Sequence, residues 1–334
     1  MKIKKIFIIA EAGVNHNGNV SRALKMVNIA KNAGADAIKF QSYVASKLST
    51  TKAPLAKYQK GKNFKNQFKL LKKYELSEKS QKKIKKYCKK KKIIFLSSGF
   101  DIQSLKFLKS LNLKFFKVPS GEITNFPYLK ELGSYNKKIL LSTGASEIKD
   151  IKFAIKTLIL SGTSKKKITL LHCNSDYPTP FRDANLKAIN FLKSKFNLNV
   201  GFSDHTLNIE ASIAAAAMGA TVIEKHFTLN QKLNGPDHLA SVNKSQLFQM
   251  VKSIRNIEIA LGQKNKFVTK SEKKNRNIIR KSIVAKKAIK RKDKFSRDNI
   301  DCKRPGNGIS PIFWNKVLGK KAKKNFKKDE LIRL

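Results

Sequence analysis

Two short stretches of the sequence each run from apolar residues into side chains that can bind metals or move protons. The first is GFSDHT, which ends in Asp204 and His205, and the second is TVIEKHFT, which carries Glu224 and His226. The two histidines stand at equivalent places after adjacent runs, so their imidazole nitrogens can share one divalent ion such as Mn, with waters and substrate oxygens completing its shell. Two separate structural histidines are the alternative interpretation.

Two lysines lie inside apolar runs, where a solvated surface lysine does not belong: Lys39 in AIKFQ and Lys117 in FFKVPSGE. An inward lysine can form a Schiff base, as in a lysine-type aldolase, or can hold a phosphate or carboxylate as a point charge. A lysine that snorkels at a strand end is the structural alternative. Together with nearby hydroxyls, the pair predicts a cradle for a small doubly anionic substrate. The serines of this cradle are Ser98, Ser120, Ser142 and Ser203.

The elements that must position these residues alternate between short apolar β-rich runs and segments with helical spacing. The predicted strands cover 6–13, 37–43, 93–100, 115–122, 138–144, 168–178, 199–206 and 221–228. Such alternation indicates parallel strands with helical crossovers. Eight units in about 260 residues predict an α/β fold of the (β/α)8 type, a TIM barrel. A doubly wound sheet is the alternative, but no Gly-rich dinucleotide fingerprint follows the first strand.

Nearly every predicted strand ends in polar side chains, which a parallel barrel gathers at one mouth. These residues are Glu11, Asn15, His16, Lys39, Gln41, Ser97, Ser98, Lys117, Ser120, Glu122, Ser142, Thr143, His172, Ser175, Tyr177, Ser203, Asp204, His205, Glu224 and His226. One such residue alone is more often a satisfied core group than a ligand. The same habit on eight strands predicts an active site, in which Glu11 and Glu224 are further metal ligands or acid/base groups.

Two insertions and a C-terminal segment complete the predicted organisation. Residues 44–76 and 229–242 both leave from the mouth end, and loops of this length favour lids; the second returns Asp237 and His238 toward the site. A helix over 246–262 closes a catalytic barrel that spans 1–262. The charged segment 263–280 reads as a linker without apolar periodicity. The small domain 281–334 is then expected to pack on its own barrel or on a partner's.

The composition is strongly basic, with 72 Lys and Arg against 22 Asp and Glu and a formal net charge of +50. Lysine is spread through nearly every helical segment, so we favour solvated surfaces over nucleic-acid binding. The three cysteines have no metal or disulfide spacing, which suits a reducing cytoplasm. No signal-peptide core or membrane-length apolar run is present. The sequence therefore predicts a cytoplasmic protein that engages neither nucleic acid nor membrane.

The ordered motifs resemble those of the sialic acid synthases and their legionaminic and pseudaminic acid relatives. They are AEAGVNHNG, AIKFQ, KVPSGE, LLSTG, LLHCNSDYPTPF, GFSDHT, IEKHFTL, GPDHLAS and KRPGNGIS. The resemblance covers essentially the whole chain and includes a small C-terminal domain similar to the antifreeze-like (SAF-type) domain. It implies condensation of phosphoenolpyruvate with an N-acylated sugar, and with it a transferase.

The resemblance also implies roles for individual residues. His205 and His226 hold Mn or Mg, which polarises the sugar aldehyde, and Glu11 and Glu224 are catalytic groups that steer water. The residues implied to bind phosphoenolpyruvate are Lys39, Ser98, Lys117, Ser120, Ser142, Ser175 and Ser203. The residues implied to bind the sugar are Glu122, Tyr177, Asp237 and Arg304. Arg304, in a turn that taken alone is an ordinary surface loop, reaches the neighbouring subunit's site in a domain-swapped homodimer.

Departures from the family pattern bear on rigidity and on substrate. SSGF stands where the family usually has STPF, so Ser98 keeps a hydroxyl while Gly99 replaces a proline, and AEAG and STGA each carry an alanine. HCNSDYPTPF is similar to the sialic and legionaminic branch. We favour N-acetylmannosamine as acceptor and N-acetylneuraminate as product, with N,N'-diacetyllegionaminate synthesis as the alternative. A Schiff-base aldolase and a nucleic-acid-binding protein are the rival functions.

Overall fold

The computed structural model describes residues 5–56, 59 and 64–334. Contacts within the chain divide it into two compact units, Met1–Gly262 and Gln263–Leu334. We describe each unit by itself. Part of the predicted lid 44–76, namely 57–58 and 60–63, lies outside the described residues.

The first unit is a closed parallel barrel in which neighbouring strands are consecutive in sequence, as predicted. Its strands are β1 (Phe7–Gly13), β2 (Ala37–Ser42), β3 (Ile94–Gly99), β4 (Phe115–Val118), β5 (Lys138–Ser142), β6 (Ile168–His172), β7 (Asn199–Asp204) and β8 (Val222–His226). β1 pairs with β8, with Glu11 opposite His226, and this pairing closes the ring. The predicted strands 115–122 and 168–178 were too long, because the chain turns at Pro119 and leaves the sheet after His172.

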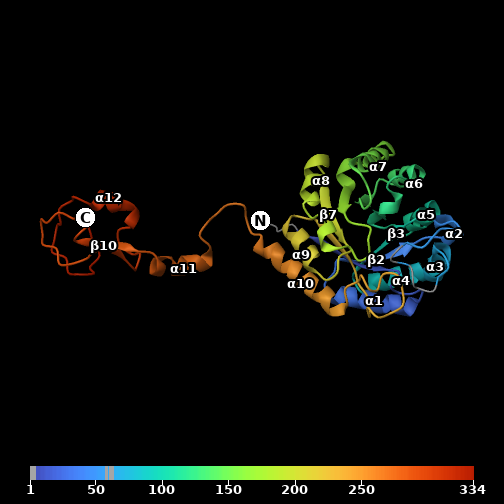
Figure 1. Ribbon diagram of the computed structural model, residues 1–334, viewed down its shortest axis with the longest axis horizontal. Helices are drawn as coiled ribbons and strands as arrows, with labels where there is room; N and C mark the ends of the chain where they lie inside the picture. The colour runs from blue at the N-terminus through green and yellow to red at the C-terminus, as the bar shows by residue number, and fades with distance from the viewer. Residues whose placement is uncertain (1–4, 57–58, 60–63) are drawn as a thin grey trace. The chain divides into compact units, whose positions relative to one another are not determined.

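Helices surround the barrel strands in Figure 1 and pack their apolar faces against them. They are α1 (Val20–Asn32), α4 (Glu78–Lys90), α5 (Ile102–Ser110), α6 (Phe126–Gly133), α7 (Ile148–Leu160), α8 (Ala188–Phe196), α9 (Glu210–Ala217) and α10 (Lys244–Ala260). Side-chain caps start several of them: the side chain of Asn19 accepts from the backbone N–H of Arg22, and Ser77 and Asp101 act in the same way for α4 and α5. The insertion after β2 contributes α2 (Ala45–Leu48) and α3 (Gln67–Tyr74).

Alternation along the strands divides the barrel interior into an apolar floor and a polar mouth. The buried floor consists of Ile9, Ala37, Leu96, Leu140, Leu171 and Val222. Two residues further along β1 and β8 the same inward face carries Glu11 and Glu224. On β7 the inward position at floor level is Gly201, where a Cβ atom would lie 2.8 Å from Leu171 and 2.5 Å from the Val222 carbonyl. The floor therefore fills the barrel below the polar layer.

The same alternation corrects several of the residues predicted to line the mouth, among them Asp204 and His172. Asp204 lies between the inward Ser203 and His205, so its side chain faces the helix layer and forms a 3.0 Å ion pair with Lys225 of β8. Both side chains are fully buried. His172 likewise faces outward from β6, where its Nε2 lies 2.9 Å from the Ala184 carbonyl. Neither residue borders the cavity inside the mouth.

The second unit has its own small core around a two-stranded antiparallel sheet, β9 (Ser282–Ala285) and β10 (Ile300–Lys303). The core includes Ile283, Phe295 and Phe326. The segment 263–280, expected to be a linker without periodic structure, contains helix α11 (Lys270–Ile279). Its capping box joins Thr269 and Glu272, which starts a helix without a buried face.

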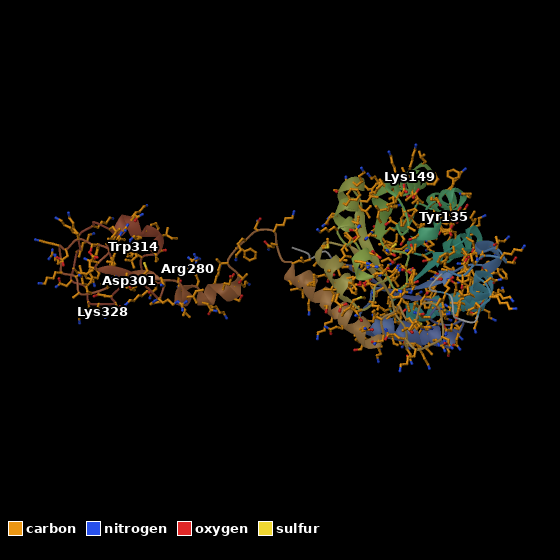
Figure 2. The ribbon with its side chains drawn as sticks, viewed as in Figure 1. Tyr135, Lys149, Arg280, Asp301, Trp314 and Lys328 are labelled. Carbon is orange, nitrogen blue, oxygen red and sulfur yellow. The ribbon has the colours of Figure 1, made fainter. Side chains whose placement is uncertain are left out.

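Lysine side chains project from the surfaces of both units, as Lys149 and Lys328 illustrate in Figure 2. Buried lysines are few by comparison: Lys39, Lys117 and Lys225 among the described residues. Each of the three has an acidic side chain within 4 Å. Within the described ranges, no helix combines the length and the apolar content needed to cross a bilayer.

Candidate active site

A cavity of about 360 Å³ opens at the carboxyl ends of the barrel strands. It gathers most of the predicted site residues, from every strand of the barrel or the loop that follows it. Those that border it are Glu11, Lys39, Ser98, Lys117, Ser120, Glu122, Ser142, Ser175, Tyr177, Ser203, His205, Glu224 and His226. Of the residues to which the resemblance assigns a role, Asp237 and Arg304 do not border this cavity. Of the other residues predicted at the mouth, Gln41 borders it, whereas Asn15, His16, Ser97, Thr143, His172 and Asp204 do not.

The base of this cavity is a cluster of two lysines and two glutamates, all at most 5% exposed. Lys39 Nζ lies 2.9 Å from Glu11 Oε2 and 3.7 Å from Glu224 Oε2, and Lys117 Nζ lies 3.8 Å from Glu224 Oε1. Serine hydroxyls complete the arrangement: Lys39 donates to Ser98, Lys117 to Ser142, and Ser203 donates to Glu224 at 2.8 Å. Each lysine of the cluster lies within 4 Å of a glutamate oxygen, which lowers the cost of burying these ionisable groups.

Protonation in the cluster is uneven. Burial raises the pKa of Glu11 to about 8, although the nearby Lys39 opposes this. Burial also acts on Glu224, but Lys117 and Lys39 outweigh it and hold the pKa of Glu224 below its usual value. At neutral pH the cluster thus contains one carboxylic acid and one carboxylate, an arrangement suited to giving one proton and taking another.

The two predicted metal-binding histidines lie side by side, with ring centroids 5.5 Å apart. His205 Nδ1 lies 2.5 Å from the Asn174 carbonyl oxygen, which can only accept, so Nδ1 carries the proton. Nε2 therefore accepts from the Tyr177 hydroxyl at 3.0 Å. Burial lowers the pKa of His205 to about 4 and that of His226 well below its usual value, so both rings are neutral.

These histidines fit a divalent cation in their chemistry. A metal ligand must be a neutral imidazole, and its second nitrogen is normally bound to a carbonyl or carboxylate, as His205 Nδ1 is here. The described residues contain no group of three or more His, Cys, Asp or Glu side chains placed to hold a metal ion. A cation at this site would thus take two protein ligands and complete its shell with water and substrate oxygens.

The four predicted sugar-binding residues have different surroundings. Glu122 borders the cavity and accepts from the Asn125 amide at 2.6 Å, and Tyr177 stands over His205 with ring centroids 4.1 Å apart. Asp237 is buried next to His226, with Oδ2 3.9 Å from Nδ1. Arg304 belongs to the second unit, where its Nε donates to the Ile279 carbonyl. Binding of a sugar by any of them remains a prediction.

Several residues near the site escaped the sequence analysis. Gln67 and Leu71 of α3 border the cavity. They belong to the insertion 44–76, whose length predicted a lid but gave no reason to choose particular side chains. Cys173 lies 3.3 Å from the Ser120 hydroxyl, and an isolated cysteine gave no signal. At Gly99, where the family usually has proline, the Tyr128 hydroxyl donates to the backbone carbonyl at 2.7 Å and fixes the strand end.

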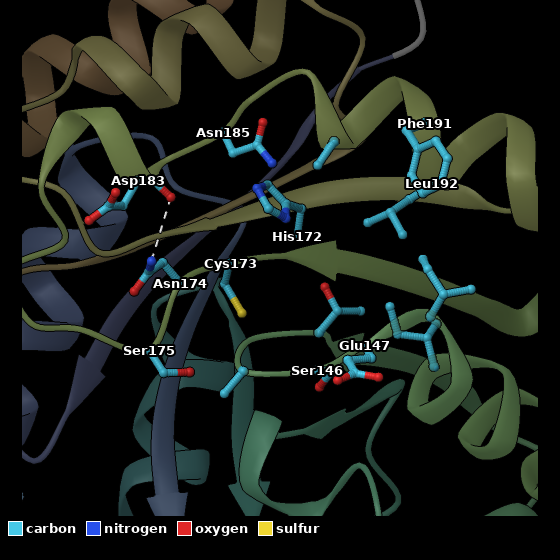
Figure 3. Close-up of a pocket in the computed structure, with 15 residues that line it drawn as sticks. Ser146, Glu147, His172, Cys173, Asn174, Ser175, Asp183, Asn185, Phe191 and Leu192 are labelled. Carbon is cyan, nitrogen blue, oxygen red and sulfur yellow. Dashed lines mark hydrogen bonds between the residues drawn. The ribbon is translucent and has the colours of Figure 1, made fainter.

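A larger cavity, of about 670 Å³, lies outside the barrel between the loops after β5 and β6 (Figure 3). Its walls include Phe191 and Leu192 of α8, and His172 and Cys173 lie at its base. The polar groups there serve loop geometry: Asn174 Nδ2 contacts the Asp183 carbonyl, and Ser146 donates to the Gly144 carbonyl. Glu147 and Asp183 also line this cavity, but the cluster of two lysines and two glutamates borders the smaller one.

The fold and the cavity are those of a TIM-barrel enzyme. Barrel enzymes place their reacting groups at the carboxyl ends of the strands, and the buried glutamates, lysines and histidines of this chain occupy that end. Perturbed ionisable groups in a cleft mark functional sites.

Comparison with known proteins identifies the family. Residues 26–266 match the NeuB family, and residues 280–334 match the SAF domain. The chain is 50% identical, over 99% of its length and 100% of the relative's, to the N,N'-diacetyllegionaminic acid synthase of Campylobacter jejuni. It is 41% identical, over 96% and 91%, to the synthase of the same name from Legionella pneumophila. The crystal structure of an N-acetylneuraminic acid synthetase from Leptospira borgpetersenii, in complex with citrate, superposes with a TM-score of 0.72 at 34% identity, covering 82% of this chain and 90% of that one.

The chain belongs to the NeuB family and is a synthase with a C-terminal SAF domain. The predicted family and the predicted fold, a TIM barrel followed by an antifreeze-like domain, are confirmed.

Proposed function

We propose that this enzyme condenses phosphoenolpyruvate with a diacetylated 6-deoxy mannose-type sugar and water, giving N,N'-diacetyllegionaminate and phosphate. The observation that carries the condensation is the pair of buried lysines, each with a serine hydroxyl, at the base of the mouth. The acceptor follows the relatives named as N,N'-diacetyllegionaminic acid synthases, at 50% and 41% identity. These relatives favour legionaminate over the N-acetylneuraminate that the motifs alone had suggested.

The residues of the cradle bind and orient phosphoenolpyruvate. Lys39 and Lys117 supply the positive charge, and Ser98, Ser142 and Ser203 supply hydroxyl donors beside them. Ser120 and Ser175 extend the cradle along the cavity wall. This places carbon 3 of phosphoenolpyruvate toward the sugar aldehyde, a positioning effect that accounts for much of the rate in such condensations.

Proton transfer is assigned to the two glutamates. Carbon 3 attacks the aldehyde carbon, the aldehyde oxygen takes the proton of Glu11, and carbon 2 becomes oxocarbenium-like. Water adds at carbon 2 and gives a proton to Glu224, which is ionised at neutral pH. The resulting hemiketal phosphate collapses to the ketone: its hydroxyl proton passes to the phosphate, which leaves by C–O cleavage.

His205 and His226 are the residues that would hold Mn or Mg. When bound, the cation supplies Lewis-acid polarisation of the aldehyde. The chain's own contribution is to keep both imidazoles neutral and buried, since a protonated ring cannot be a ligand. Glu122, Tyr177 and Asp237 are proposed contacts of the sugar.

The wider setting is proposed from the sequence and the resemblance. The chain works in the cytoplasm as a domain-swapped homodimer, in which Arg304 of the SAF domain reaches the partner's sugar site. The lysine-rich surface is a solvated surface that takes no nucleic acid. Its side chains point outward in both units (Figure 2), which supports this interpretation.

Phosphate release tests the proposal. Purified, EDTA-stripped protein receives Mn and phosphoenolpyruvate with either the diacetylated 6-deoxy sugar or N-acetylmannosamine. We expect release with the diacetylated sugar at a clearly higher kcat/KM. Preference for N-acetylmannosamine would restore the neuraminate assignment, and release with neither sugar would refute the condensation. Borohydride trapping with pyruvate, which a Schiff-base aldolase requires, should yield no adduct at Lys39 or Lys117.

A further inference from the structure

We infer that Asp237 is a positioning residue for His226: its carboxyl group accepts a hydrogen bond from Nδ1–H and so leaves Nε2 as the nitrogen available to a cation. This inference rests on the metal site proposed above. It gives Asp237 a second role, in addition to the sugar contact proposed above.

The first observation is an unsatisfied nitrogen. His226 Nδ1 is fully buried and has no hydrogen-bond partner among the described residues. A neutral imidazole needs an acceptor for its one N–H, and a buried polar group without a partner is costly. The Asp237 carboxyl group faces it, with Oδ2 3.9 Å away. That distance is longer than a hydrogen bond, but such bonds at active sites often tighten only when the ligands are bound.

The backbone is built to let these two groups meet. A Cβ atom on Gly13 would lie 3.2 Å from His226 Nδ1 and 3.3 Å from Asp237 Oδ2, so both groups pack over the bare Cα atom. Gly13 has φ of +50°, a conformation that residues with side chains rarely adopt. The end of β1 therefore leaves room for a histidine–carboxylate pair and for little else.

The backbone of Asp237 is held in place by the chain around it. The Ser241 hydroxyl donates to the backbone carbonyl of Asp237 at 2.6 Å, and the Asn15 amide donates to the Ser241 hydroxyl at 2.8 Å. The backbone N–H of Val242 donates to the His226 carbonyl, which ties the end of this loop to β8. Asp237 is thus fixed relative to the histidine, as an orienting group must be.

His205 shows the same design with a different acceptor. Its Nδ1 donates to the Asn174 carbonyl. Its Nε2 lies on the opposite side of the ring and accepts from the hydroxyl of Tyr177, which borders the cavity. Carbonyl and carboxylate acceptors are the two usual partners of metal-binding histidines. Asp237 is 6% exposed and does not border the cavity, which suits contact with the ring of His226.

The test is Mn²⁺ affinity without substrates, measured from the free-ion electron paramagnetic resonance signal during titration of the full chain. Asp237→Asn should weaken Mn²⁺ binding about 10- to 100-fold relative to wild type. Glu122→Gln is the matched control, because this second carboxyl group borders the same cavity but is hydrogen-bonded to the Asn125 amide, and the substitution should change the Kd less than about twofold. An Asp237→Asn Kd equal to that of wild type would overturn the inference.

The wild-type and variant titrations distinguish failure of this inference from failure of the proposed metal site. If wild type shows no saturable Mn²⁺ binding, the proposed metal site fails, and the role of Asp237 fails with it. If Asp237→Asn does not fold, ¹⁵N-histidine correlation spectra of the wild type decide instead, with His226→Gln to assign the signal. We expect His226 to be protonated on Nδ1; protonation on Nε2 would overturn the inference.

Discussion

Asp204→Asn is the perturbation whose effect follows most directly from the structure. Asp204 and Lys225 are both fully buried between the barrel and its helices, with 3.0 Å between Oδ2 and Nζ. The carboxylate also accepts from the Thr206 backbone N–H and from the hydroxyls of Thr206 and Ser212. Lys225 has one further acceptor, the Thr206 carbonyl. The substitution therefore leaves a buried ammonium without its counter-charge.

Removing one partner of such a pair costs about 3–5 kcal/mol in the free energy of unfolding. In a unit of this size, that corresponds to a fall of about 10 °C in the melting temperature. The assay is urea unfolding followed by far-UV circular dichroism, with Lys5→Met as control. Lys5 is 61% exposed in its ion pair with Asp36, so its loss should cost less than about 1 kcal/mol.

A double variant, Asp204→Asn with Lys225→Met, isolates the pair. Because the unpaired charge is gone, it should recover much of the lost stability, and the cycle should give a coupling energy of at least about 2 kcal/mol. A loss below about 1 kcal/mol in the free energy of unfolding of Asp204→Asn, or strict additivity in the cycle, would show that the Asp204–Lys225 ion pair does not stabilise the barrel.

Three further predictions concern the chemistry. Lys117→Met removes a charged donor from the cradle and should lower kcat/KM for phosphoenolpyruvate about 10- to 100-fold, whereas the exposed Lys114→Met should leave it unchanged; equal losses would contradict the cradle. Because burial raises the pKa of Glu11 to about 8, activity should fall as pH rises through that value and the carboxyl loses its proton. In Glu11→Gln, kcat should drop at least about 100-fold, and the fall in activity at alkaline pH should disappear. If that fall is unchanged in the variant, another group is responsible for it. Removing divalent ions with EDTA should abolish phosphate release and Mn should restore it, and full activity in protein verified to be metal-free would contradict the role of His205 and His226.

The strands were predictable because each is a short apolar run followed by a helical segment, and this order admits few folds. Membership of the site was predictable for the same reason, since residues at strand ends share one mouth. The face of each residue was harder to predict. In GFSDHT the alternation sends Asp204 away from Ser203 and His205, and counting positions against Glu224 and His226 would have shown this.

Other features could not be predicted because they depend on residues far apart in the chain. Lys39 lies opposite Glu11 once β1 and β2 pair. The sharing of Glu224 by two lysines appears only when the barrel closes and brings β8 to β2 and β4. The unusual pKa of Glu11 depends on its burial, which has no signature in AEAG. Helix α11 has no apolar periodicity, and its capping residues are the main sequence signal that indicates it.

The most direct test of the central claim is the fate of the bridging oxygen of phosphoenolpyruvate. The substrate is labelled with ¹⁸O between carbon 2 and phosphorus and is converted with the diacetylated 6-deoxy sugar and Mn, and both products are analysed by mass spectrometry. Attack through carbon 3 followed by C–O cleavage predicts that the label leaves with inorganic phosphate. Label retained in the sugar acid would mean P–O cleavage and would contradict the proposed reaction.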